Sequence, residues 1–249
     1  MTSRPFIGAL SLLVLLSTTG SQLASASPPR IARRPDVIAD WKARLLAANT
    51  ELEASNWRKG ASIADSVLRE MRERIASGDE SASLLAVALL FRAIGESGKG
   101  NLEDGAWDFG AAQALHPPYK HVDLTPYGAV AGLLDEWRYD SSANAAAHAA
   151  ELVAMTDPAI TPPRKLRGDP PSYPHAKSLA CIHGPIVVQS VINAQGRLEH
   201  PYVAPGTDPV LALAAIDGIR DWRFVPAKRN DSPISVLFVL NVNFKLPLC

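Results

Sequence analysis

The fold of the C-terminal half is decided by residues 184–203, which read GPIVVQSVINAQGRLEHPYV. The β-branched run from Pro185 to Ile192 predicts a strand. A tight turn is expected over Asn193 to Gly196, because asparagine and glycine tolerate the backbone angles that such turns need. A second, weaker strand follows from Arg197 to Val203, where a proline interrupts the pattern. The stretch therefore predicts a β-hairpin.

A helix and a third strand follow this hairpin. Asp208 is a suitable N-cap with Pro209 at the first helical position, and the apolar pattern predicts a helix that ends near Asp221. The strand from Pro233 to Phe244 has two faces. One face carries Val236, Phe238, Leu240, Val242 and Phe244, and the other carries Leu237, Val239, Asn241 and Asn243. We expect an antiparallel sheet in the order second, first, third strand, with the helix packed on one face.

Several motifs of this half occur together in a recognisable order. They are Tyr173-Pro174-His175-Ala176, Gly184, Val191-Ile192-Asn193-Ala194-Gln195-Gly196, Leu213-Ala214-Ala215, Trp222-Arg223-Phe224-Val225-Pro226-Ala227 and Pro233. Over about residues 168–246 the chain thereby resembles the C-terminal domain of TonB energy-transducer proteins. We interpret the aromatic residues as packing groups. Trp222 and Phe224 are expected to seal the helix against the sheet, while Tyr173 and Pro174 hold the entering chain.

The resemblance implies a function in binding and no catalysis. TonB-like domains bind a short extended segment of an outer-membrane receptor by adding it to an exposed sheet edge. The expected strand order leaves such an edge on the last strand. The candidate edge residues are Val236, Leu237, Phe238, Val239, Leu240, Asn241 and Val242. The alternative is that the preceding chain or a second copy covers this edge.

The region from Asp36 to about Met155 has helical periodicity and repeats itself at an offset of 45 residues, which aligns Asn56 with Asn101. It predicts three helical hairpins within a domain over residues 36–156. The second hairpin resembles a tetratricopeptide repeat. That resemblance rests on Leu89, Ala93, Gly100, Gly105, Phe109, Ala112 and Pro117. The pattern departs from the family at Glu96, where an aromatic residue is usual, and a generic helical bundle is the alternative.

The two halves are joined by a proline-rich segment over residues 157–172, followed by a TonB-like domain over residues 173–249. Six prolines occur between Pro158 and Pro174. Because proline disrupts both helices and sheet ladders, we expect an extended connector without either.

The N-terminus has the layout of a secretory signal peptide over residues 1–26. Arg4 precedes an apolar run from Phe6 to Leu16, and the segment closes with Ala24-Ser25-Ala26. The run is shorter than a bilayer-spanning helix requires. We therefore expect cleavage after Ala26 and export to the periplasm. The alternative is a retained anchor in the inner membrane facing the periplasm.

The composition excludes other classes. Lys plus Arg number 25 and Asp plus Glu number 25, without a block of like charges, so no nucleic-acid footprint is present. The histidines show no metal-ligand spacing, and no cofactor is expected. The two cysteines, Cys181 and Cys249, flank the expected sheet, and we predict that they form a disulfide. A pairing of Cys181 with His183 as nucleophile and base is the weaker catalytic alternative, since no third group orients it.

These observations lead to one functional hypothesis and one alternative. We expect an exported periplasmic adaptor that docks an extended segment of a protein or peptide, such as a TonB-dependent outer-membrane receptor. The alternative is a membrane-anchored energy transducer for TonB-dependent transport, which would contact inner-membrane motor proteins if residues 1–26 are retained.

Overall fold

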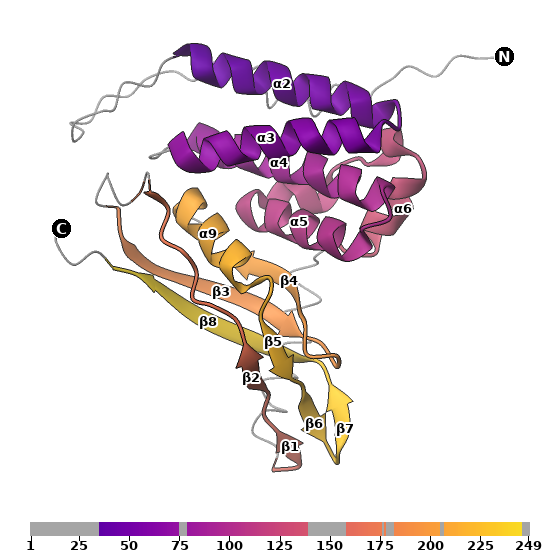
Figure 1. Ribbon diagram of the computed structural model, residues 1–249. Helices are drawn as coiled ribbons and strands as arrows, with labels where there is room; N and C mark the ends of the chain where they lie inside the picture. The colour runs from indigo at the N-terminus through magenta and orange to yellow at the C-terminus, as the bar shows by residue number, and fades with distance from the viewer. Residues whose placement is uncertain are drawn as a thin grey trace.

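A computed structural model describes most of the chain after the N-terminal segment (Figure 1). The described residues are 35–74, 79–138, 158–175, 177, 182–204 and 207–245. An N-terminal group of helices is followed by a C-terminal half built on antiparallel sheets. The predicted α+β class is thereby confirmed. The predicted signal peptide lies outside the described residues.

The helical half consists of consecutive helices that pack on one another. They are α2 (Pro35–Glu53), α3 (Trp57–Arg74), α4 (Asp79–Gly98), α5 (Leu102–Leu115), η1 (Pro117–His121), η2 (Thr125–Tyr127) and α6 (Ala129–Asp135). The repeated asparagines, Asn56 and Asn101, immediately precede α3 and α5, as the offset of 45 residues predicts. For the third hairpin we expect helices over residues 126–137 and 142–155. The first is divided between η2 and α6, and the second lies outside the described residues.

Small residues let α4 and α5 approach closely. A Cβ atom at Gly105 would lie 2.0 Å from the Ser97 hydroxyl and 2.9 Å from the Ala93 carbonyl, so only glycine fits there. Gly100 adopts a φ of 89° in the turn between the helices, and Phe109 of α5 is fully buried. The positions behind the tetratricopeptide resemblance therefore make a tight hairpin, whereas membership of that repeat family stays a prediction.

The C-terminal half has the expected sheet. Its elements are β3 (Gly184–Ile192), β4 (Leu198–Val203), α9 (Pro209–Ile219) and β8 (Val236–Phe244). The strands are antiparallel in the order β4-β3-β8, which is the order predicted from the sequence. Asp208 caps α9, since its carboxylate accepts hydrogen bonds from the backbone N–H groups of Val210 and Leu211.

The expectation of no sheet in the proline-rich segment is wrong. Strand β1 (Ile160–Thr161) pairs with β6 (Ala227–Arg229), and β2 (Arg164–Arg167) pairs with β5 (Arg223–Val225). A further strand, β7 (Ser232–Ile234), pairs with β6. The two proline-flanked strands have only two and four residues, and each lies at a sheet edge where missing N–H donors are tolerated.

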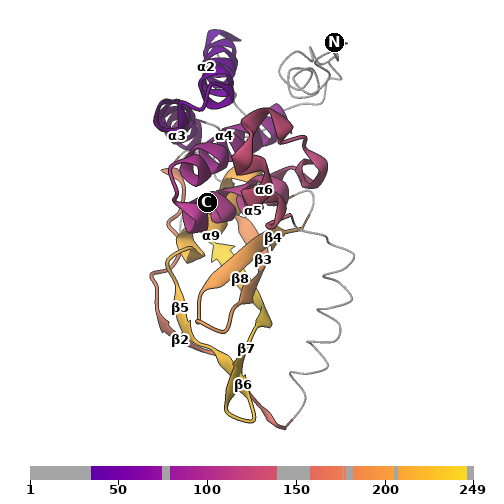
Figure 2. The ribbon, with the colours of Figure 1, turned by 90° about the vertical axis from the view of Figure 1, so that its right-hand side faces the viewer.

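The two halves share one continuous hydrophobic core. Helix α5 lies against β4 and α9, so the helical half covers one end of the C-terminal half (Figure 2). At this contact Gly110 of α5 faces the ring of Pro201 in β4. The segment over residues 157–172 is therefore no extended connector between separate bodies, although the domain boundaries themselves stay predictions.

Candidate peptide-binding edge

Strand β8 has one open edge. It pairs with β3 and, among the described strands, with no other. The register between β3 and β8 is unbroken over their nine pairs. An edge strand with this geometry presents a row of backbone donors and acceptors to whatever lies beside it.

Alternation along β3 identifies the backbone groups of β8 that are free. The Asn193 N–H donates to the Arg197 carbonyl across the hairpin at 2.9 Å, so odd-numbered residues of β3 direct their backbone groups toward β4. Even-numbered residues of β3 then bond to their even-numbered partners in β8. Pro185, which has no N–H, stands opposite Asn243 in a pair that this alternation leaves unbonded.

The odd-numbered residues of β8 therefore direct their N–H and C=O groups to the open edge. These residues are Leu237, Val239, Asn241 and Asn243. They provide four donors and four acceptors, as many as a short added strand needs.

Side chains in the middle of β8 are incompletely covered on both faces. On the core face Val236 and Val242 are buried, whereas Phe238 and Leu240 between them are only half-buried. On the opposite face Val239 is 47% exposed, and Val187 of β3, which pairs with Asn241, is 39% exposed. An added strand would cover both faces of this middle section and would bury apolar surface as well as backbone groups.

The residues that form this sheet match a known protein family. Residues 169–246 match the family described as Gram-negative bacterial TonB protein C-terminal. The match confirms the resemblance inferred from the motifs and covers about a third of the chain. It associates the C-terminal half with TonB-related transport and protein interaction. No curated protein matches the chain.

The aromatic residues of the TonB-like domain meet at the core face of β8. Trp222 and Phe224 are both buried, and the Phe224 ring lies 5.1 Å from the Phe238 ring in an edge-to-face arrangement. At the other end of the strand the Tyr173 ring lies 5.4 Å from Phe244. The entering chain is fixed there, because the Tyr173 hydroxyl donates to the Ile182 carbonyl at 2.5 Å.

The hairpin turn is held against β5. Gly196 has a φ of 76°, and its carbonyl accepts the Phe224 N–H at 2.9 Å. A Cβ atom at Gly196 would lie 1.9 Å from the Phe224 carbonyl oxygen, which explains why glycine is needed. Gly184 begins β3, and Pro226 separates β5 from β6. Pro174 lies between β2 and β3, where its carbonyl accepts the Lys177 N–H at 3.1 Å.

One ion pair of the domain was missed by the sequence analysis. Lys177 is fully buried, and its Nζ lies 2.5 Å from Oδ2 of Asp208. Asp208 thus caps α9 and also ties the entering chain to it. A single lysine after a proline-rich stretch gives no sequence signal for burial, so this pair could not be predicted.

A charge cluster at the contact between the halves was also missed. Arg92 of α4 makes two hydrogen bonds of 2.7 Å to the buried carboxylate of Asp108. Burial alone would lower the pKa of Arg92, but the hydrogen bonds and charge of Asp108 outweigh it and raise that pKa. Arg220, which follows α9, reaches Asp104 at 2.6 Å and Asp108 at 3.3 Å. The cluster therefore links the TonB-like domain to α5.

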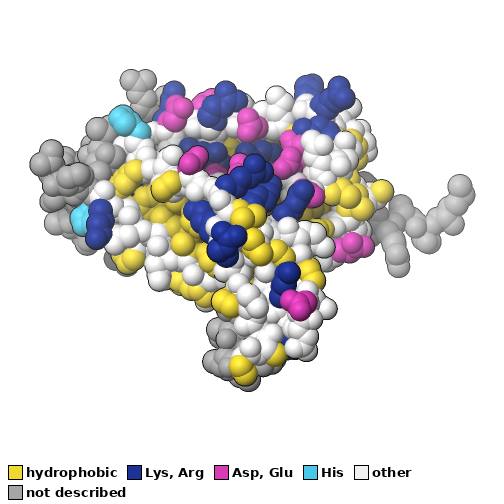
Figure 3. Space-filling model, turned by 60° about the horizontal axis from the view of Figure 1, so that its bottom comes forward, with side chains coloured by type: hydrophobic (Ala, Val, Ile, Leu, Met, Phe, Trp, Pro, Cys, Tyr) yellow, Lys and Arg dark blue, Asp and Glu magenta, His cyan; other side chains and the backbone are white. Residues whose placement is uncertain are grey.

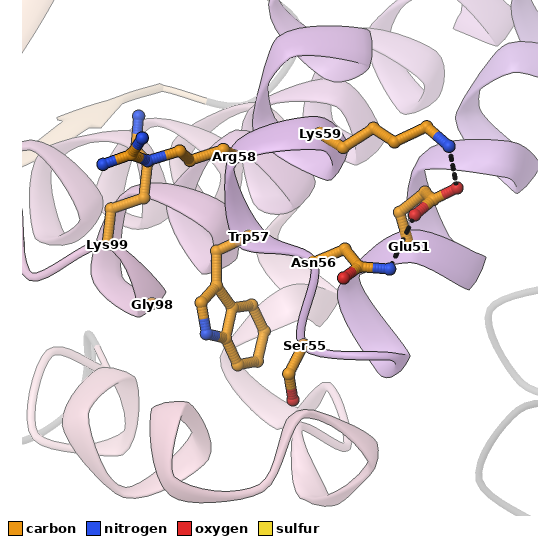
Figure 4. Close-up of a pocket in the computed structure, with 8 residues that line it drawn as sticks. All are labelled: Glu51, Ser55, Asn56, Trp57, Arg58, Lys59, Gly98 and Lys99. Atoms are coloured by element: carbon orange, nitrogen blue, oxygen red, sulfur yellow. Dashed lines mark hydrogen bonds and ion pairs between the residues drawn. The ribbon is translucent and has the colours of Figure 1, made fainter.

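A shallow hollow of about 570 Å³ lies on the helical half (Figure 4). Glu51 binds Lys59 at 2.6 Å and Asn56 at 2.9 Å within the hollow, whereas Lys99 pairs with Glu96 of α4 at 2.6 Å. The Lys59 hydrogen bond is the main cause of the lowered pKa of Glu51. Trp57 packs on Gly98 at its floor. The hollow belongs to the helix turns and contributes nothing to the β8 edge.

Other sequence predictions are not tested by the described residues. Cys181 and Cys249 both lie outside them, so the disulfide and the Cys181–His183 alternative stay predictions. Among the described residues, no group of three or more His, Cys, Asp or Glu side chains could hold a metal ion. None of the described helices combines the length and the apolar character that crossing a membrane requires.

Proposed function

We propose that the protein is an exported periplasmic adaptor that captures an extended segment of a partner protein on the open edge of β8. The partner would be a receptor of the TonB-dependent outer-membrane class. The observation that carries this proposal is the row of outward backbone groups on Leu237, Val239, Asn241 and Asn243, on a strand whose middle is half-covered on both faces. The match to the TonB C-terminal family supports it independently.

The helical half has a defined place in this proposal. Its α5 surface is occupied by β4 and α9, so any second partner would bind to another surface of the helices. Because the halves share one core, the helical half would hold the β8 edge in a fixed orientation relative to that second partner. A retained N-terminal anchor would convert the same adaptor into a transducer component, and the fate of residues 1–26 decides between the two.

The test is a pair of variants at one position of the edge. Val239→Pro removes an outward N–H, whereas Val239→Ala shortens the same side chain and keeps the N–H. The probe is a short capped peptide in which valine and threonine alternate and asparagine ends each terminus, labelled for fluorescence anisotropy.

We expect the peptide to bind the parent protein and Val239→Ala but not Val239→Pro, with unchanged circular dichroism in all three. Equal binding to a folded Val239→Pro variant would refute the edge as the docking site. Leu240→Pro is not a suitable variant, because the Leu240 N–H faces β3 and its loss would disrupt the sheet.

A further inference from the structure

Strand β2 carries an exposed basic cluster that the proposed function does not use. The cluster consists of Arg164, Lys165 and Arg167, and all three are exposed. It lies just before residue 169, where the family match begins, and therefore outside the matched residues. Figure 3 shows Lys and Arg side chains gathered beside hydrophobic ones on one face of the molecule.

The cluster lacks internal neutralisation. In the part of the chain that the structure describes, no carboxylate forms an ion pair with Arg164 or Arg167. Arg167 also stands directly opposite Arg223 in the pairing of β2 with β5. Like charges in that position destabilise a strand pair. Since the whole chain has equal numbers of basic and acidic residues, this local excess is not a result of composition.

The basic cluster is connected to β8 through β5 and its aromatic residues. Lys165 is the pairing partner of Phe224, whose ring contacts Phe238 in the half-covered middle of β8. The Lys165 Nζ lies 3.1 Å from the centre of the Trp222 ring, so the lysine side chain packs on that ring. The Trp222 ring in turn lies 6.4 Å from the Phe224 ring. From β2 the chain continues to Tyr173, which contacts Phe244 at the far end of β8. The cluster thus lies nearer to the N-terminal end of β8.

We propose that β2 selects the captured segment by charge. The segment would be an extended peptide with apolar residues along β8 and at least one Asp or Glu at the end that lies beside Phe238. Its carboxylate would pair with Arg164 or Arg167, because guanidinium groups bind carboxylates with two parallel hydrogen bonds. This inference rests on the proposed docking edge and adds the chemistry of the partner.

The test compares three capped peptides. Each has the alternating valine and threonine core described above, and its termini carry two asparagines, two aspartates at the N-terminal end, or two aspartates at the C-terminal end. Because exposed ion pairs are weak, we expect one aspartate peptide to bind about five-fold more tightly than the asparagine peptide at low salt. That preference should disappear in about 1 M NaCl, where charges are screened within about 3 Å.

Two double variants isolate the cluster. Arg164→Gln with Arg167→Gln should abolish the preference for aspartate and leave binding of the asparagine peptide unchanged. Arg58→Gln with Arg74→Gln removes the same charge from exposed sites on α3. This control should change neither the preference for aspartate nor the affinity for the asparagine peptide. Equal binding of all three peptides to the parent protein would overturn the charge selection while leaving the docking edge intact.

If the β8 edge is not the docking site, the result is different: Val239→Pro would then leave the binding of every peptide unchanged. A lipid partner is the other outcome that would overturn the inference. It would appear as binding to phosphatidylglycerol vesicles that the β2 double variant abolishes, without any preference among the peptides.

Discussion

The contact between α5 and β4 can be tested by adding a single methyl group. Gly110 of α5 faces Pro201, and a Cβ atom at Gly110 would lie 2.9 Å from the proline Cδ. That separation is too short for two carbon atoms, and neither the helix nor the proline ring can move easily. Gly132 of α6 is the matched control, because a Cβ atom there would meet nothing within 4 Å.

The two alanine substitutions should have different effects on the free energy of unfolding. Alanine is favoured over glycine in a helix by about 1 kcal/mol, so Gly132→Ala should stabilise the protein by up to that amount. The same gain at Gly110 is opposed by overpacking, which typically costs about 1–3 kcal/mol. Gly110→Ala should therefore leave the free energy of unfolding between unchanged and about 2 kcal/mol lower, and the two variants should differ by at least about 1 kcal/mol.

The assay is urea unfolding of the full chain, followed by tryptophan fluorescence and by circular dichroism. Because the halves share one core, both signals should report one transition. Equal stabilisation by Gly110→Ala and Gly132→Ala would refute the packing of α5 on β4. Two separate transitions in the parent protein would show that the halves fold as independent bodies.

Three further predictions concern single groups. Asp208→Ala should destabilise the protein by about 3 kcal/mol or more in urea unfolding, since it leaves the buried Lys177 without its carboxylate and α9 without its cap. The double variant Asp208→Ala with Lys177→Met should recover part of this loss, because no buried charge is then left unpaired. Burial lowers the pKa of His116 below 6.5, so the folded state binds fewer protons, and the unfolding free energy should fall as pH drops below about 6.5; His116→Gln should flatten this dependence. Gly196→Ala should lower the melting temperature, because the added methyl group collides with the Phe224 carbonyl and the turn needs a positive φ.

Strand order and capping were predictable because they depend on local patterns. The two-residue alternation of β8 and the turn at Gly196 determine which strands pair and which face is buried. Asp208 and Pro209 mark the start of α9 by local chemistry alone. The candidate edge followed from this order, although the identity of its free backbone groups needed the register of β3 against β8.

Contacts between distant segments were not predictable. The proline-rich segment forms β1 and β2 because β5 and β6 offer partners more than 50 residues away, and no local preference reports such partners. Arg220 and Asp108 are likewise ordinary surface types in sequence, yet they meet at the contact between the halves. Glycine is unfavourable in the interior of a helix, and the reason for Gly110 is the close contact with Pro201 of β4, which the sequence does not reveal.

The most direct test of the docking edge is amide hydrogen exchange, measured by NMR on the full chain with and without the alternating valine and threonine peptide. In the free protein the amides of Phe238, Leu240 and Val242 should exchange slowly, because they bond to β3. Those of Leu237, Val239 and Asn241 should exchange quickly and become protected when the peptide is added. Protection of these odd-numbered amides before any peptide is present, or no change on its addition, would contradict the account.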